Sequence, residues 1–316
     1  MRISVVIPCY RSARTIDAVV DELRNVFSAR RVDDYEIVMV SDHSPDDVYE
    51  VISRMCETDS QHLRGIELAR NFGQHAALMA GYAATNGEVV VSIDDDGQTP
   101  VESLFDLVDA LDSKNADVAY GSYAEKRHSS FRNFGSRVND WMLCWLLGKP
   151  RNIKVTSYFA ARRFVIDEML RYKQAFPYVI GLVFRTTRSI VNVPVLHRKR
   201  AQGVSGYTFG KLLGLWVNGF TAFSVRPLRL ATMIGFASAS LGFVFGIWAI
   251  VNKLLIHPDA PIGYSSMMSA ILFIGGVIML ILGLIGEYVG RIYICMNQSP
   301  QYVISRTTKD VNKDTI

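Results

Sequence analysis

The stretch Ser92-Ile93-Asp94-Asp95-Asp96-Gly97-Gln98-Thr99 follows the apolar run Val89-Val90-Val91. A β-branched run of this length is typical of a buried strand. Three consecutive carboxylates at the end of that strand would repel one another unless a cation lies among them. A helix N-terminus, which favours negative charge, would account for one of the aspartates but not for all three. The stretch therefore predicts a divalent-metal site at the end of a strand.

Mg²⁺ and Mn²⁺ are the metals that such a cluster favours. Hard divalent cations take oxygen ligands, usually one or two protein carboxylates, and water and substrate phosphates fill the remaining positions. A site of this kind normally serves a nucleotide. We therefore expect Mg²⁺ or Mn²⁺ as the cofactor and a phosphate-bearing nucleotide as the ligand.

Strands and helices are expected to alternate in the amino-terminal part of the chain. Apolar runs predict strands, and apolar residues at helical spacing predict helices, the last of them at 101–114. One helix is expected to open on a capping box at Ser44-Pro45-Asp46-Asp47. The alternation predicts a parallel sheet, whose ligands bind beyond the carboxyl ends of its strands. The predicted strands are 3–7, 36–40, 65–68 and 89–93, and Tyr10, Asp42 and Asp94 to Asp96 follow such ends.

Two segments near the carboxyl end, 230–251 and 268–286, contain no charged residue. Each is long enough to cross a hydrocarbon core of roughly 30 Å, so two transmembrane helices are expected. A buried helical hairpin of a soluble protein is the alternative. Arg226, Arg229 and Arg291 flank the outer ends of the pair. Since positive residues favour the cytoplasmic side, both termini are predicted to be cytoplasmic.

Glycines within the predicted spans have the spacing of helix-packing motifs. Gly242 and Gly246 lie in the first span, and Gly286 and Gly290 lie at the end of the second. Small residues four apart let helix backbones approach closely in a bilayer. Homo-oligomerisation through the transmembrane helices is therefore possible for this chain.

Charge is unevenly distributed along the 316 residues, although the net charge is only +4. Residues 1–120 contain 10 Lys and Arg against 22 Asp and Glu, whereas residues 121–229 contain 19 against 4. Because the basic segment precedes the predicted spans, anionic headgroups and a phosphate-bearing lipid are its candidate partners. Nucleic acid is the competing partner, but the chain has no recognisable nucleic-acid motif. We expect the lipid bilayer and a lipid phosphate, and no nucleic acid, to bind here.

Several motifs stand in a fixed order along the chain: Val5-Val6-Ile7-Pro8-Cys9-Tyr10, Val40-Ser41-Asp42-His43-Ser44-Pro45-Asp46, residues 68–81, residues 93–98, residues 200–207 and residues 223–229. This ordered set resembles the polyprenyl-phosphate glycosyltransferases. They are inverting GT-A enzymes that include dolichol-phosphate mannose synthase and bacterial undecaprenyl-phosphate sugar transferases. The resemblance covers nearly the whole chain.

The resemblance implies an α/β GT-A domain, Rossmann-like with a mostly parallel sheet, followed by interfacial amphipathic helices and two transmembrane helices. Residues 141–147 and 211–223 are the expected interfacial helices, with packing against the sheet as the alternative. The implied parts are a nucleotide-sugar and metal-binding core (1–130), an acceptor-binding and membrane-interface segment (131–229), transmembrane helices (230–251 and 268–286) and a cytoplasmic tail (287–316).

The resemblance also implies roles for individual residues. Asp94 and Asp96 match the family's DxD pair and, with Gln98, would hold the metal. Together with Arg200, the two aspartates would be the catalytic residues. The nucleotide-sugar would be bound by Pro8, Tyr10, Asp42, Asp94 and Asp95. Arginine offers fixed donor forks to phosphate oxygens, and the phosphates of the donor and the lipid acceptor would be surrounded by Arg132, Ser136, Arg200, Ser205 and Tyr207.

The chain departs from the family pattern in several places. Arg11 stands where the family usually has Asn, Ser41 replaces the first of two aspartates, and Gly206 replaces a frequent Lys. The stretch 156–159 lacks the Asp that many members place there as a proposed catalytic base. A phosphomonoester acceptor has a second pKa of about 6 and is already largely dianionic at neutral pH. A strong general base is therefore dispensable for such an acceptor.

The sequence as a whole predicts an inverting transferase that moves one sugar from a nucleotide-sugar to polyprenyl phosphate, with undecaprenyl phosphate preferred, at the cytoplasmic face of a bacterial plasma membrane. A processive polysaccharide synthase is one alternative, but the Gln-x-x-Arg-Trp acceptor motif of that class is absent. A non-catalytic membrane scaffold with a degenerate transferase domain is the other. The substitutions at Arg11, Ser41 and Ser157 favour the scaffold, whereas the intact Asp94 and Asp96 argue against it.

Overall fold

The computed structural model describes residues 1–123, 144, 148–196, 226–251, 263–297 and 299–308. The chain divides into two compact units, Met1–Thr208 with Gln298–Ile316, and Phe209–Asn297. The first unit holds the sheet with its covering helices, and the second holds two long helices.

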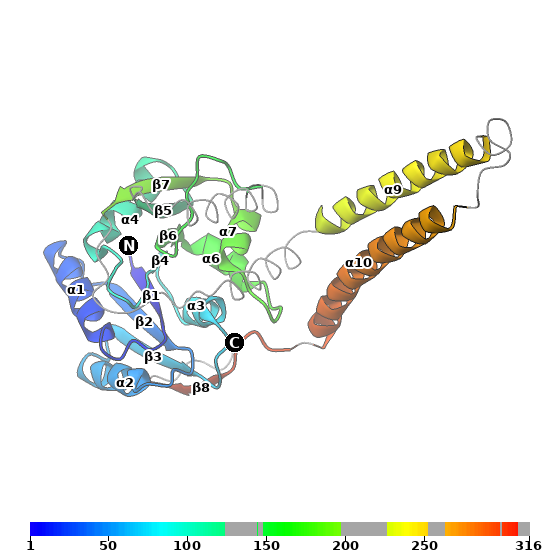
Figure 1. Ribbon diagram of the computed structural model, residues 1–316. Helices are drawn as coiled ribbons and strands as arrows, with labels where there is room; N and C mark the ends of the chain where they lie inside the picture. Colours follow the sequence, from blue (N-terminus) through cyan, green and yellow to red (C-terminus); the bar gives the residue numbers. More distant parts are fainter. Residues whose placement is uncertain (124–143, 145–147, 197–225, 252–262, 298, 309–316) are drawn as a thin grey trace. The chain divides into compact units, whose positions relative to one another are not determined.

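The sheet of the first unit has the strand order β7-β5-β6-β4-β1-β2-β3-β8 (Figure 1). β1 pairs in parallel with β2 and β4, β2 pairs with β3, and β5 pairs with β7. β6 and β8 run antiparallel to their neighbours. The mostly parallel sheet confirms the part of the predicted fold class that concerns the amino-terminal α/β domain. The strands are β1 (Ile3–Cys9), β2 (Tyr35–Ser41), β3 (Leu63–Leu68), β4 (Val89–Ser92), β5 (Val118–Tyr123), β6 (Phe159–Arg162), β7 (Ile190–Val195) and β8 (Ile304–Thr307).

Helices cover both faces of the sheet (Figure 1). One face packs against α1 (Ile16–Ala29), α2 (Val48–Thr58) and α4 (Leu104–Ser113), which follows the 3₁₀ turn η1 (Val101–Ser103). The other face carries α3 (Gln74–Ala83), which packs on β1 and β2 and contacts α6 (Arg163–Leu170) and α7 (Val179–Thr186).

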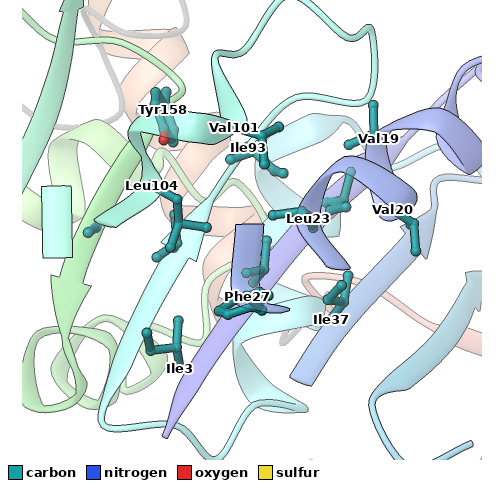
Figure 2. Packing of buried hydrophobic residues seen from close by; sticks show 14 of the residues in the cluster. Ile3, Val19, Val20, Leu23, Phe27, Ile37, Ile93, Val101, Leu104 and Tyr158 are labelled. Atoms are coloured by element: carbon teal, nitrogen blue, oxygen red, sulfur yellow. The ribbon is translucent and has the colours of Figure 1, made fainter. Parts of the chain in front are cut away.

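The core between the sheet and α1 contains large apolar side chains from several elements (Figure 2). Leu23 and Phe27 of α1 are fully buried beside Ile37 of β2 and Leu104 of α4. The Phe27 ring stacks on Tyr35 with ring centroids 4.1 Å apart. Burying each such side chain stabilises the fold by about 1.5–3 kcal/mol, so the strands that deliver the site residues are rigidly held.

On the opposite face, α3 lies unusually close to β1. A Cβ added at Gly81 would come within 2.4 Å of Val6 Cγ1, which no side chain could tolerate without a shift of the helix. Glycine is therefore required at this contact. The close approach fixes α3, whose first residues contribute to the candidate site described below.

The predicted strands and helices of the amino-terminal part are all present, but the capping box is wrong. α2 begins at Val48, and no side chain caps it. The Ser44 and Asp46 side chains instead accept hydrogen bonds from the loop after β1: the Arg11 amide donates to Ser44 Oγ at 2.7 Å, and the Ala13 amide donates to Asp46 Oδ2 at 3.0 Å. The two residues therefore brace the loop that carries Tyr10.

The chain after the second long helix returns to the sheet as β8, a strand that the sequence did not predict. Its pairing with β3 is antiparallel, with Ile66 opposite Thr307. Arg306 Nε lies 2.6 Å from Glu67 Oε2, and the guanidinium lies 4.5 Å from the centroid of the Tyr49 ring. Part of the segment 287–316 is therefore a component of the first unit's sheet and not a free tail.

The second unit contains α9 (Arg226–Val251) and α10 (Tyr264–Met296), which contact each other. Both helices extend beyond the predicted spans. In the described part of the chain, one segment is long and apolar enough to cross a membrane, Phe273–Ile294, with a mean hydropathy of 2.0, and the apolar segment of α9, Ala231–Val244, is shorter.

Three of the glycines with helix-packing spacing, those that the structure describes in full, do not lie at a tight contact between α9 and α10. A Cβ added at Gly242, Gly286 or Gly290 would meet no atom within 4 Å. The contact instead involves Gly235, where an added Cβ would lie 3.5 Å from Ile281 Cδ1. Among the residues that the structure describes, the spacing of Gly242, Gly286 and Gly290 therefore plays no part in the packing of α9 on α10.

Candidate active site

The carboxyl ends of the central parallel strands bring the predicted nucleotide and metal residues to one edge of the sheet. Tyr10 follows β1, Asp42 follows β2, and Asp94 to Asp96 follow β4 after Ile93. The Tyr10 amide donates to Asp95 Oδ2 at 2.9 Å, and the Asp42 amide donates to the Cys9 carbonyl at 3.1 Å. These contacts confirm that the strand ends converge, as the parallel sheet predicted.

Asp94 receives a hydrogen bond on each of its carboxylate oxygens. Gln74 Nε2, at the start of α3, donates to Oδ1 at 3.1 Å, and the Ser157 hydroxyl, just before β6, donates to Oδ2. Burial is the main reason why the pKa of Asp94 is raised, and the nearby Asp96 carboxylate raises it further. Two neutral donors thus hold a half-buried carboxylate without neutralising its charge.

Asp96 is bonded to Gln98. The Gln98 amide donates to Asp96 Oδ1 at 3.0 Å, and Gln98 Nε2 donates to Asp96 Oδ2. The side chain predicted to be a third metal ligand therefore acts as a donor to the second one. Gly97 between them has a φ of +70°, a backbone conformation that glycine adopts without strain and that lets this tight turn form.

The carboxylates at this edge supply part of the ligand set of a divalent metal, and water or substrate phosphates can supply the rest. Among the residues that the structure describes, no group of three or more His, Cys, Asp and Glu side chains is placed to hold a metal ion. Two neighbouring carboxylates are nevertheless what Mg²⁺ or Mn²⁺ needs from a protein when substrate phosphates and water supply the other ligands. Asp94 and Asp96 fit that requirement, and their mutual repulsion favours a cation between them.

Asp95 contacts the loop after β1. Besides the bond from the Tyr10 amide, the Thr15 hydroxyl donates to the Asp95 carbonyl at 2.7 Å. Burial raises the pKa of Asp95 to about 6, although the bond from Tyr10 opposes the shift. Asp95 therefore joins β4 to the loop that presents Tyr10, whose own side chain is 46% exposed.

Asp42 anchors the loop between β3 and α3. It is only 4% exposed, and its two oxygens accept the amides of Phe72 at 2.7 Å and Gly73 at 2.8 Å. Burial raises the pKa of Asp42 despite these two bonds. Gly73, with a φ of +91°, precedes α3 directly, so Asp42 positions the turn that delivers Gln74 to Asp94. Pro8 is buried within β1, beyond the part of that strand that pairs with β4.

Arg11 has a φ of +58°, in the left-handed region where Asn is far more common than Arg. The backbone conformation explains the family's Asn at this position. In this chain the Arg11 guanidinium lies 5.6 Å from the centroid of the Tyr10 ring. A positive charge therefore stands beside the exposed aromatic ring at the edge of the site.

Gln74, Tyr123 and the Ser157 contact are parts of the site that the sequence did not indicate. Tyr123, at the end of β5, has a pKa raised to about 12 by burial and by the charges of Asp94 and Asp96. Gln74 lies inside a motif that was recognised, but only the parallel arrangement of β3 and β4 brings it to Asp94. The predicted phosphate-binding residues Arg132, Ser136, Arg200, Ser205 and Tyr207 and the predicted interfacial helices lie outside the described residues, apart from Cys144.

Comparisons with known proteins agree with this geometry. Residues 4–170 match the model of glycosyl transferase family 2, and residues 226–292 match the GtrB C-terminal hairpin. The chain is 32% identical over 311 residues to an undecaprenyl-phosphate 4-deoxy-4-formamido-L-arabinose transferase of Klebsiella pneumoniae (strain 342), covering 98% of this chain and 94% of the relative. The relative of the same name from Sodalis glossinidius (strain morsitans) is 32% identical over 305 residues, with 96% and 93% covered.

Solved structures share the fold at lower identity. The glucosyl-3-phosphoglycerate synthase of Mycobacterium tuberculosis, in complex with Mn²⁺, uridine-diphosphate-glucose and phosphoglyceric acid, has a TM-score of 0.52 and 18% sequence identity. The match covers 70% of this chain and 78% of that structure. The likeness supports the GT-A fold. The strand-end carboxylates, the family model over more than half of the chain and the full-length relatives together establish that this chain is a glycosyltransferase of family 2 that belongs to the polyprenyl-phosphate glycosyltransferases.

Proposed function

We propose that the chain transfers a single sugar from a nucleotide-sugar to polyprenyl phosphate, with undecaprenyl phosphate as the preferred acceptor. The observation that carries the proposal is the pair Asp94 and Asp96 at the carboxyl edge of the sheet, in a chain that matches relatives named for undecaprenyl phosphate over nearly their whole length. The attacking phosphate oxygen bonds to the anomeric carbon, and the electron pair of the broken bond leaves with the nucleoside diphosphate.

Asp94 and Asp96 would hold Mg²⁺ or Mn²⁺. When bound, the metal supplies positive charge that stabilises the departing diphosphate. Gln98 supports this arrangement by donating to Asp96. The glucosyl-3-phosphoglycerate synthase, which has the same fold, is in complex with Mn²⁺ and a nucleotide-sugar, and this supports a divalent metal in the present chain.

The nucleotide would lie over the ends of β1 and β2. The exposed Tyr10 ring offers an apolar face for the base, and Arg11 beside it adds a positive charge. The surface is shaped by Asp42, Asp95 and Pro8. The Asp42 and Asp95 side chains accept backbone amides of neighbouring loops and so hold those loops in place, and Pro8 is buried in β1.

The acceptor phosphate would bind to the basic segment 121–229, with Arg132, Ser136, Arg200, Ser205 and Tyr207 as its proposed contacts. The loop before β6, residues 148–158, contains no Asp or Glu, so it supplies no carboxylate base. A phosphate dianion needs no such base, whereas an alcohol acceptor does. The composition of this loop therefore supports a phosphate acceptor over the sugar hydroxyl that a processive polysaccharide synthase would use.

Membrane attachment would come from the hairpin of α9 and α10, with both termini on the cytoplasmic side. The match to the GtrB C-terminal hairpin and the apolar segment Phe273–Ile294 support this part of the proposal. The enzyme would then meet its lipid acceptor at the inner surface of a bacterial plasma membrane, with residues 131–229 at the interface.

The test is incubation of the purified full chain with a panel of nucleotide-sugars and undecaprenyl phosphate, followed by mass spectrometry of the lipid fraction. The expected product is undecaprenyl phosphate carrying one sugar, formed with at least one donor. Undecaprenol, which lacks the phosphate, is the matched acceptor and should remain unmodified. Products carrying several sugars, or sugar on undecaprenol, would contradict the proposal.

A further inference from the structure

The register of β4 and β6 determines which residue faces Asp94. The two strands pair antiparallel, with Ser92 opposite Phe159. If this register continues two residues beyond the ladder, Ser157 lies opposite Asp94. Directly opposed residues of antiparallel strands have Cβ atoms about 4.5–5.5 Å apart, close enough for side chains to bond. The hydrogen bond from the Ser157 hydroxyl to Asp94 Oδ2 agrees with this arrangement.

The residues around Ser157 fix its position. Tyr158 is fully buried, and its hydroxyl donates to the Pro100 carbonyl at 3.3 Å. The Thr156 hydroxyl donates to the Gly121 carbonyl at 2.9 Å. Because its two neighbours are tied to the residue before η1 and to β5, Ser157 has little freedom to move away from Asp94.

Gln74 is fixed in the same way on the other side of Asp94. The preceding turn is held by Asp42, which accepts the amides of Phe72 and Gly73, and α3 is pressed against β1 at Gly81. Gln74 Nε2 therefore reaches Asp94 Oδ1 from a rigid helix start. Two donors, one from each side, hold the two oxygens of one carboxylate.

From this geometry we infer that Gln74 and Ser157 are positioning residues that orient the Asp94 carboxylate for the divalent metal. Each donor occupies one lone pair of its oxygen and leaves the other for a cation. Partners that orient a metal ligand typically contribute 10- to 100-fold to metal affinity. The inference rests on the proposed function only for the identity of Asp94 as a ligand. A carboxylate at position 157 would instead oppose Asp94 with a like charge.

The test compares Ser157→Thr with Ser157→Val in the purified full chain. The two variants have side chains of the same shape, and only threonine keeps the hydroxyl. Mn²⁺ alone is titrated, and bound ion is measured by electron paramagnetic resonance. We expect Ser157→Thr to bind Mn²⁺ within about 3-fold of wild type and Ser157→Val to bind it about 10-fold or more weakly. Sugar transfer at saturating Mn²⁺ should change much less than the affinity, which separates positioning from a general structural defect.

Gln74→Met provides a second variant that does not depend on the folding of Ser157→Val. Methionine is close in size to glutamine and lacks the donor, so its Mn²⁺ affinity should fall by a similar factor. Equal Mn²⁺ affinity in Ser157→Thr, Ser157→Val and Gln74→Met would overturn the inference. So would the failure of wild type to bind Mn²⁺. A wild type that binds Mn²⁺ but transfers no sugar overturns the proposed function, and the comparison of the variants still decides the inference.

Discussion

Carboxylates at the two ends of the central strands have opposite environments. At the amino-terminal edge, Glu36 is 3% exposed and accepts bonds from Ser4 Oγ at 2.7 Å, the Asn86 amide at 2.6 Å and Arg2 at 3.3 Å. At the carboxyl edge, burial and then the nearby Asp96 carboxylate raise the pKa of Asp94, and the donors to Asp94 are neutral. The protein supplies a cationic partner at the first edge, whereas the described residues leave negative charge uncompensated at the second. The difference supports the proposal that a cation binds at the carboxyl edge.

The largest effect on sugar transfer is expected from Asp96→Ala. Removing one of two ligands should reduce sugar transfer at least about a thousandfold, or about 4 kcal/mol of transition-state stabilisation. In chelator the variant should melt no lower than wild type, because a repulsion between carboxylates is relieved. Steady-state transfer rates and thermal melting in detergent provide the two measurements. A fully active Asp96→Ala variant would contradict the proposed metal site at this edge.

Glu36→Ala should lower the stability of the protein and leave its metal binding unchanged, the reverse of what is expected for Asp96→Ala. The change leaves the Ser4 hydroxyl, the Asn86 amide and Arg2 without their buried acceptor, which should lower the free energy of unfolding by about 3 kcal/mol. Mn²⁺ affinity of the folded variant should equal that of wild type. Glu36→Gln, which keeps one acceptor, is the milder control. A Glu36→Ala variant that lost metal affinity without losing stability would contradict the proposed difference between the two edges.

Arg200→Ala tests whether the basic segment provides positive charge for the phosphates. Loss of one charge-assisted contact should cost about 1.5–3 kcal/mol in kcat/KM. The measurement is the transfer rate as a function of nucleotide-sugar and of undecaprenyl phosphate, each varied at saturation of the other. Unchanged constants for both substrates would exclude Arg200 from the site.

Asp95→Asn is expected to change the stability of the protein less than Glu36→Ala does. The pKa of Asp95 in the folded state, about 6, lies above the ordinary aspartate value, so the folded state binds this proton more tightly than the unfolded state does. Stability therefore falls as the pH rises from about 4 to about 6, and the loss is complete above that range. Asparagine carries no charge and can still accept the Tyr10 amide. In chelator, Asp95→Asn should be more stable than wild type at neutral pH by on the order of 1 kcal/mol, with no difference near pH 4. A lower melting temperature for Asp95→Asn at neutral pH would contradict this assignment.

Local patterns in the sequence predicted the central parallel strands of the sheet. Continuous apolar runs predicted β1 to β4. Their alternation with helices predicted a parallel sheet, and the parallel sheet predicted that Tyr10, Asp42 and Asp94 to Asp96 meet at its carboxyl edge. β8 was missed because Ile304–Thr307 is short and has only one apolar residue, and its stability comes from pairing with β3 far away in sequence. β5, β6 and β7 lie after the helix predicted at 101–114, in a part of the chain where no strand was predicted.

The site was predicted to the level of the strand ends but not to the level of contacts. The roles of Asp94 and Asp96 remain predictions that their geometry supports. The resemblance to the family implies that Gln98 is a metal ligand, but its side-chain amide donates to Asp96. Ser157 reaches Asp94 only because β6 runs antiparallel to β4, which no local pattern shows. Likewise, Ser44 and Asp46 have the composition of a helix cap, yet their side chains bond the loop after β1.

The most direct test of the central claim is metal removal and return in wild type. Sugar transfer to undecaprenyl phosphate is measured after treatment with EDTA, and then during titration with Mn²⁺ or Mg²⁺ in excess of the chelator. We predict that EDTA abolishes transfer while the melting temperature stays the same or falls, and that added metal restores the full rate. Undiminished transfer in EDTA, from protein shown by metal analysis to contain no divalent ion, would contradict the account.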